Sequence, residues 1–247
     1  MEIKKTDQSS WTKEFTFEHL DLGLAVAAGN TFRRLLSTRV PGWAIFAVKI
    51  SDKEKTIASE FEKLKGVTEI PLYLILNLKK LVFQSSQEYS SLQEKETNSP
   101  IFNLQISVDN SQSKENYIVT GKDVQGDLKI INPEVYLATV EEGSQLKIDL
   151  YCRYHLGSYV AREQKSLLPK KENIIFLPSD YCPVKTVSWK TEPVLNKQEE
   201  KLILTITTNG SISPQDSLLR IASFLERMMI DIQHQLTNSK KTETKTS

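Results

Sequence analysis

Few side chains in this sequence stand at spacings that support catalysis. The three histidines, His19, His155 and His234, are scattered and form no cluster of the kind that binds a metal ion. Residues 120–123, TGKD, contain the Gly-Lys pair of a phosphate-binding loop, but Asn116 replaces its first glycine and Asp123 its final Ser or Thr. We therefore expect no catalytic residue, metal site or cofactor in this chain.

The remaining catalytic patterns are also missing. The sequence has no Gly-x-Ser-x-Gly elbow, and no serine is paired with a base. The adjacent carboxylates Glu141-Glu142 and Glu199-Glu200 lie in hydrophilic turns, where we interpret them as solvated surface. The residues thus favour a scaffold or binding protein, with an unrelated small-molecule enzyme as the alternative.

One charged feature stands out in the stretch AAGNTFRRLLSTRVPG, residues 27–42, where Arg33 and Arg34 are adjacent. Asn30 is a suitable helix cap, and Pro41-Gly42 ends the helix. An apolar face recurs at helical spacing in Phe32, Leu35, Leu36 and Val40. The arginine pair then lies on solvated helix surface or on a surface that docks another protein.

The composition limits the classes of protein to which this chain can belong. The chain has 247 residues, of which 39% are hydrophobic, and a formal net charge of +1, which argues against a dedicated nucleic-acid binder. Its length suits one large domain or two modest ones. Cys152 and Cys182 are too few for a disulfide framework, so we expect buried thiols in a reducing compartment. Without a signal peptide or a membrane span, we expect a soluble intracellular protein.

The spacing of apolar residues and turn residues predicts several secondary-structure elements. A helix is predicted to begin near Pro71, and residues 84–100 are predicted to form a long polar loop. Between residues 101 and 160, short β-type runs alternate with turns. In the last of these runs, Asp149, Tyr151 and Arg153 alternate with apolar neighbours, as in a half-buried strand.

The clearest element is a long helix from Pro214 to Leu236. Ser213 is its predicted N-cap, with Asp216 three residues later. One stripe of this helix is apolar: Leu218, Ile221, Ala222, Leu225, Met229, Ile232 and Leu236. Such a stripe needs a partner, which is its own domain, another chain or both. The fold class is α+β, in which the chain leaves one domain, builds a second and returns.

Five segments, taken in order along the chain, carry a resemblance: FEHLDLGLAVAAGNTFRRLLSTRVPGWAIFAVKI (17–50), SEFEKLKGVTEIPLYLILNLKKL (59–81), VTGKDVQGDLKIINPEVYLATVEEGSQLKIDL (119–150), DYCPVKTVSW (180–189) and TNGSISPQDSLLRIASFLE (208–226). In this order they resemble segments of the RNA polymerase alpha subunit of bacteria and plastids. The departures are AAGN in place of Thr-Leu-Gly-Asn and LGSYVA at Leu156 in place of Gly-Arg-Gly-Tyr-Val.

The resemblance implies the two-subdomain N-terminal domain of that family. Residues 1–50 with 179–236 would form a dimerisation subdomain, 51–178 an inserted, mainly-β subdomain contacting the large subunits, and 237–247 a disordered tail. The family's C-terminal domain, which contacts promoter DNA, has no counterpart here, so we expect DNA contact only through the assembled polymerase.

The resemblance also implies a role: a homodimeric scaffold that binds the beta and beta-prime subunits and has no active site. Arg34, with Arg33 beside it, would contact beta, and Lys79 and Leu177 would contact beta-prime. The implied dimer interface comprises Phe32, Leu35, Leu36, Leu218, Ile221, Leu225, Met229 and Ile232. The location would be the bacterial cytoplasm or plastid stroma, and a divergent dimerising paralogue outside the polymerase remains the alternative.

Overall fold

The computed structural model describes residues 2–85, 99–169, 172–194 and 197–243. The chain divides into two compact units, of which unit 1 comprises residues 1–40 and 184–247 and unit 2 comprises residues 41–183. The chain thus leaves unit 1, builds unit 2 and returns. We expected the crossings after residues 50 and 178. The first lies earlier because strand β3 (Gly42–Asp52) pairs with a strand of unit 2 over its full length.

Unit 1 is built on a four-stranded antiparallel sheet in the order β1-β2-β14-β13. Its strands are β1 (Glu2–Ser9), β2 (Thr12–Asp21), β13 (Val184–Pro193) and β14 (Glu199–Thr208). Alternation along β14 buries Leu202, Leu204 and Ile206, and the paired residues Phe17 and Phe15 of β2 are buried with them. These side chains form the apolar face on which the helices pack.

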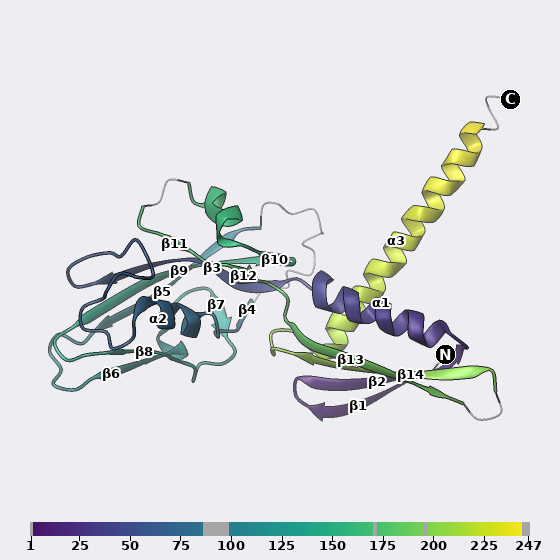
Figure 1. Cartoon of the computed structure of the whole chain (residues 1–247), viewed down its shortest axis with the longest axis horizontal. Coiled ribbons are helices and arrows are strands. Elements are labelled where there is room, and N and C mark those ends of the chain that lie inside the picture. Colours follow the sequence, from purple (N-terminus) through teal and green to yellow (C-terminus); the bar gives the residue numbers. More distant parts are fainter. Residues whose placement is uncertain (1, 86–98, 170–171, 195–196, 244–247) are drawn as a thin grey trace. The chain divides into compact units, whose positions relative to one another are not determined.

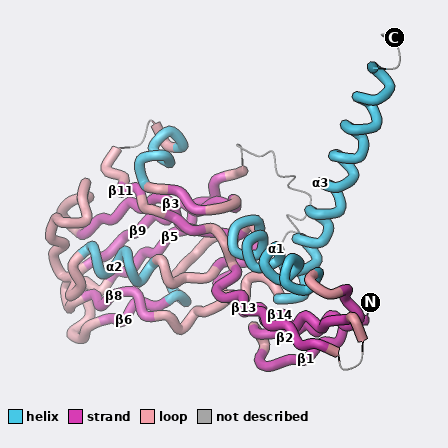
Figure 2. Tube along the Cα trace, turned by 45° about the vertical axis from the view of Figure 1, so that its right-hand side comes forward, coloured by secondary structure: helices cyan, strands magenta, loops and turns pink. Residues whose placement is uncertain are grey.

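Two helices complete unit 1, and Figures 1 and 2 show them beside the sheet. Helix α1 (Leu24–Arg39) contacts β2, β13 and β14, and α3 (Pro214–Glu243) crosses α1. The expected start of α1 at Asn30 was wrong, since Asn30 lies inside the helix. The expected disordered tail from residue 237 also differs from the structure, in which α3 continues through Glu243; residues 244–247 lie outside the described part.

Unit 2 is centred on a second antiparallel sheet, in the order β11-β3-β9-β5. Its further strands are β5 (Ile101–Asp109), β9 (Gln145–His155) and β11 (Ile175–Phe176). Three two-stranded ladders accompany it: β4 (Phe83–Ser85) with β7 (Leu128–Ile130), β6 (Tyr117–Thr120) with β8 (Tyr136–Val140), and β10 (Ser158–Tyr159) with β12 (Ser179–Asp180). Helix α2 (Pro71–Leu78) begins at the predicted proline. The α+β class is confirmed.

The sheet of unit 2 is covered on both faces. The main core packs on one face and includes Ile148, Leu150 and Cys152 of β9. The other face carries Phe46 and Tyr151, against which residues around the 3-10 helix η3 (Ala161–Leu167) pack. The prediction of a half-buried β9 was therefore wrong near its end, where Tyr151 and Arg153 are buried as well.

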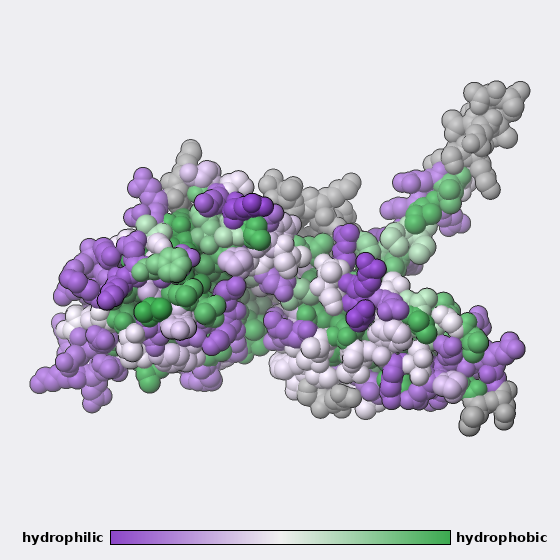
Figure 3. Space-filling view, in the orientation of Figure 1, coloured by the Kyte–Doolittle hydropathy of each residue, from purple (hydrophilic) through white to green (hydrophobic). Residues whose placement is uncertain are grey.

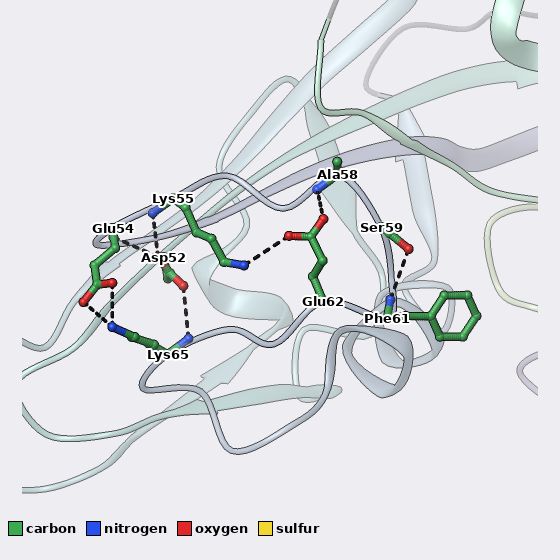
Figure 4. Close-up of polar contacts among 8 residues, drawn as sticks. All are labelled: Asp52, Glu54, Lys55, Ala58, Ser59, Phe61, Glu62 and Lys65. Carbon is green, nitrogen blue, oxygen red and sulfur yellow. Dashed lines mark hydrogen bonds and ion pairs between the residues drawn. The ribbon is translucent and has the colours of Figure 1, made fainter.

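A charged loop follows β3, and Figure 4 shows its contacts. Both carboxylate oxygens of Asp52 accept backbone N–H bonds: Oδ1 from Glu54 and Lys55 at 2.8 Å each, and Oδ2 from Lys65 at 3.0 Å. The ammonium of Lys65 also donates to Glu54. Asp52 thereby closes the loop that ends at Lys65, thirteen positions further along the chain. Most of the predicted 84–100 loop, residues 86–98, lies outside the described residues.

Candidate protein interaction surfaces

The paired carboxylates of β14 bind two neighbouring segments: Glu200 binds Gly23 at the start of α1, and Glu199 binds His19 of β2. The backbone N–H of Gly23, whose φ is 85°, donates to Glu200 Oε1 at 3.1 Å. His19 Nδ1 lies 2.8 Å from Glu199 Oε2, a hydrogen bond that lowers the pKa of this carboxyl. The interpretation of this pair as solvated surface was wrong, because each carboxylate accepts a hydrogen bond from, or shares one with, a residue of another segment. The pair Glu141-Glu142 is exposed, as expected.

One face of α1 packs in the core of unit 1. Ala25, Gly29 and Leu36 are buried along it. The ring of Phe32 stacks on Phe17 with centroids 5.8 Å apart and an interplanar angle of 17°. Of the residues expected at a dimer interface, Leu36 thus belongs to the core, while Phe32 and Leu35 are half-buried.

The arginine pair lies outside that face. Successive residues turn by about 100° around a helix axis, which places Arg34 about 160° from Leu36 and Arg33 about 60° from it. Both are exposed, and neither guanidinium has an ion pair with any residue in the described part of the chain. Arg39, at the end of the helix, lies over the ring of Phe224 with Cζ 5.3 Å from the centroid. Arg33 and Arg34 therefore present two unpaired cations on the surface of unit 1.

Helix α3 begins with the predicted cap. The N–H of Asp216 donates to Ser213 Oγ at 3.0 Å, and that hydroxyl donates to Asp216 Oδ2 at 2.6 Å. The arrangement differs from a full capping box, in which the carboxylate would reach back to the backbone of the cap residue. The cap fixes the helix start at Pro214 and hence the direction in which the apolar stripe runs.

The apolar stripe of α3 is covered only along its first turns. Ile221 is buried and Leu218 and Leu225 are half-buried within unit 1, whereas Met229, Ile232 and Leu236 are exposed. These three side chains lie on the same side of the helix as Leu218 and Leu225. In Figure 3, hydrophobic residues reappear along the part of the helix that projects from unit 1. The structure therefore leaves the outer part of this apolar stripe exposed, and we call these three residues, Met229, Ile232 and Leu236, the α3 stripe.

The two residues expected to contact beta-prime differ in exposure. Lys79 is exposed at the end of α2 and lines an open hollow with Tyr159, Glu163 and Asp180. Leu177 is only 3% exposed, and its N–H donates to the backbone oxygen of Phe46 at 2.8 Å. Leu177 therefore supports this surface from beneath, while its neighbour Pro178 lines the hollow.

Sequence reasoning missed a second apolar surface, on the outer side of α2. Leu72, Tyr73 and Leu76 are exposed there, while Leu74, Ile75 and Leu78 are buried. The signal was present, since residues 70–78 are apolar on all sides except at Asn77. The described residues contain no group of three or more His, Cys, Asp or Glu side chains placed to bind a metal ion. None of the described helices combines the length and apolar character needed to cross a membrane.

Comparison with known proteins gives these surfaces a context. The RNA polymerase Rpb3/RpoA insert domain matches residues 48–181, which lie within unit 2. The chain is 30% identical over 223 residues to the DNA-directed RNA polymerase subunit alpha of Aster yellows witches'-broom phytoplasma, covering 90% of this chain. It is 30% identical over 217 residues to the subunit of the same name from Malacoplasma penetrans, covering 85% of this chain.

The chain spans 63% of the length of each of these relatives. The matched region includes the insert domain and extends beyond it on both sides within this chain. A third subunit of that name, from Onion yellows phytoplasma, is 29% identical over 223 residues. The chain belongs to the family of the RNA polymerase alpha subunit.

Proposed function

We propose that this chain is a homodimeric assembly scaffold of a bacterial DNA-directed RNA polymerase, located in the cytoplasm. In this role it binds the beta and beta-prime subunits and supplies no catalytic group. The family relationship supports the polymerase context, and the α3 stripe carries the scaffold role.

The argument for a dimer rests on the apolar area left open on α3. Met229 is 58% exposed and Leu236 62% exposed, although both continue a stripe whose first turns are core. Burial of apolar surface contributes about 25 cal/mol per Å². In a dimer, the α3 stripe of one copy would pack against the α3 stripe of the other, since a two-fold interface joins the same surface of both copies. Four half-buried residues of α1 and α3 would complete this interface: Phe32, Leu35, Leu218 and Leu225.

The large subunits would bind elsewhere on the two units. Arg34 suits a contact with beta because its planar guanidinium binds carbonyl or carboxylate groups in a fixed geometry. Lys79 and the hollow that it lines suit a contact with beta-prime, with Leu177 holding that surface in place. Because a dimer has two copies of each surface, one protomer would engage beta and the other beta-prime.

The first test is the oligomeric state by sedimentation velocity. We expect a dimer at micromolar concentration, and Ile232→Glu should convert it to a monomer by placing a charge in the apolar stripe. His234→Glu is the matched control, since this exposed residue lies about 160° around the helix from Ile232. A stable wild-type monomer, or equal dissociation of both variants, would contradict the proposal.

The second test separates the polymerase scaffold from a dimerising paralogue. The tagged chain is co-expressed with the beta and beta-prime subunits of the same bacterium and purified by its tag. A scaffold retains both subunits through size-exclusion chromatography, and the Ile232→Glu variant loses them. A dimer that retains neither subunit would support the paralogue instead.

A further inference from the structure

Unit 2 contains a buried cation that has no acidic partner among the residues that the structure describes. Arg153, near the end of β9, is 7% exposed. Its Nε is fully buried and has no hydrogen-bond partner, and its guanidinium forms no ion pair within the described ranges. The contact it does make is with the ring of Tyr181, whose centroid is 5.8 Å from Cζ. Buried charges in proteins are normally paired, because removing an ion from water costs several kcal/mol.

The groups around Arg153 do not neutralise it. Burial lowers the pKa of Arg153, and the phenols of Tyr181 and Tyr159 act in the opposite direction. His155 stands two residues further on in β9, and its pKa is lowered by burial and by the charge of Arg153. Near pH 7 the imidazole is therefore neutral, while the guanidinium stays protonated. The site carries a single net positive charge.

The neighbouring polar groups are already engaged with one another. The hydroxyl of Tyr181 donates to Gln164 Oε1 at 2.7 Å, and Gln164 Nε2 donates to the backbone oxygen of Leu177 at 2.7 Å. The hydroxyl of Ser179 donates to the backbone oxygen of Ile45 at 2.7 Å. These groups hydrogen-bond to one another, and among the described residues none of them is hydrogen-bonded to Nε of Arg153.

Of the guanidinium nitrogens, Nε is the one that is both fully buried and unpartnered. From this we infer that the terminal edge of the guanidinium is the part that a ligand can reach. Two parallel N–H groups on a planar fork match the two oxygens of a carboxylate. A second buried donor without a partner, the hydroxyl of Ser99, stands two residues before Ile101, which pairs with Arg153 in the β5–β9 ladder. Two unsatisfied donors thus occur at the same end of β9.

We propose that the terminal edge of Arg153 binds one carboxylate group, on an Asp or Glu side chain of a protein that docks at this end of β9. One carboxylate matches the single charge of the site, whereas a phosphate dianion would leave a net negative charge among phenols and a neutral imidazole. The aromatic rings of Tyr159, His155 and Tyr181, which pack on one another at centroid distances of 4.9–6.0 Å, would shield the pair from water. The proposal does not depend on the polymerase role.

The test uses the isolated ¹⁵N-labelled chain and the NMR signals of the arginine Nε–H groups. The Arg153 signal is identified by its loss in Arg153→Lys. Titration with sodium acetate should shift this signal saturably, whereas sodium chloride at equal ionic strength should not. The signal of Arg162, an exposed arginine of the same unit, serves as the internal control and should not shift saturably. Inorganic phosphate should bind at least about fivefold more weakly than acetate, since its second charge is unmatched.

Thermal unfolding gives an independent readout. Acetate at a saturating concentration should raise the Tm of the wild-type chain by about 2–4 °C but leave that of Arg153→Leu unchanged. In acetate-free buffer Arg153→Leu should unfold at the same or a higher temperature than wild type, because the unpaired charge is gone. If the leucine variant does not fold, Arg153→Lys, which keeps the charge but loses the fork, should bind acetate at least about tenfold more weakly.

The outcomes also identify the source of the carboxylate. Millimolar binding of acetate, together with protection of the Arg153 Nε–H signal from exchange when a docking protein is bound, supports a protein side chain. Micromolar binding of a free carboxylate would assign the site to a small molecule instead. Absence of a saturable shift, an unchanged affinity in Arg153→Lys, or tighter binding of phosphate than of acetate would overturn the proposal.

Discussion

Gly29 of α1 lies so close to Trp189 of β13 that a β-carbon on residue 29 would come within 2.6 Å of Trp189 Cδ2. This contact lets α1 approach the sheet of unit 1 where the indole ring covers it. The glycine in the middle of the helix costs about 1 kcal/mol in helix propensity. The close packing against Trp189 offsets this cost. It explains why α1 begins at Leu24 and continues through Gly29.

We expect Gly29→Ala to lower the free energy of unfolding by up to about 2 kcal/mol. Overpacking costs about 1–3 kcal/mol, and the better helix propensity of alanine returns about 1 kcal/mol. Urea unfolding at a fixed protein concentration measures the difference. In a Trp189→Ala background the clash is absent, so the same substitution should stabilise the protein by up to about 1 kcal/mol. A destabilisation that is equal in both backgrounds would disprove the packing explanation.

Two residues that were both expected at the dimer interface should behave differently. Leu36 is fully buried within unit 1, so Leu36→Ala should lower the free energy of unfolding by about 2–5 kcal/mol. Met229→Ala should change the unfolding of the monomer by less than about 0.5 kcal/mol, because Met229 is exposed there. It should instead raise the dissociation constant of the dimer, measured by sedimentation equilibrium. The reverse pattern would mean that the core of unit 1 is assigned incorrectly.

The loop closed by Asp52 should make stability depend on pH in the acid range. Partial burial opposes ionisation of Asp52, but the N–H donors of Lys65, Lys55 and Glu54 outweigh it and hold the pKa of the carboxyl below its usual value. A lowered pKa contributes stability above the unfolded-state pKa of about 3.9, and this stability is lost as the pH falls through the folded-state value.

Asp52→Asn should therefore cost about 1–2 kcal/mol at pH 7, since an amide cannot accept all three bonds. The difference from wild type should shrink below pH 4 and vanish once the carboxyl is protonated, as followed by urea unfolding at each pH. Glu54→Gln, which removes an exposed ion pair with Lys65, is the control and should cost less than about 0.5 kcal/mol at every pH. A constant difference between Asp52→Asn and wild type from pH 3 to 7 would rule out the charged hydrogen bonds as its cause.

The arginine pair gives a prediction about assembly. Arg34→Ala should leave the fold and the dimer intact, because its side chain is exposed on the far side of α1 from the core. It should weaken recruitment of the beta subunit by about tenfold, a typical loss for a central interface arginine. Pull-down with purified beta measures this, with Arg33→Ala as the companion and Arg162→Ala as the control. Capture of beta by the Arg34 variant at the wild-type level would refute the assignment.

Local chemistry in the sequence determined several elements correctly. Pro71 marks the first turn of α2 because proline lacks an N–H that the first turn leaves unbonded anyway, and Ser213 caps α3 because its hydroxyl is near that helix's free amides. The same chemistry placed the long apolar stripe of α3. The family resemblance of the ordered segments also came from sequence, and the match of residues 48–181 confirms it.

Only the tertiary structure decided which side chains are buried by distant segments and which remain exposed. Periodicity shows which side of a helix is apolar, but not that Ile221 meets a neighbour and Ile232 does not. The same holds for Arg153, which alternation assigned to a polar face and which is buried in the structure beside the ring of Tyr181. It holds also for Gly29, whose place inside a helix depends on Trp189, 160 residues further along the chain. Burial depends on contacts between distant segments, and a local pattern of residue types does not contain them.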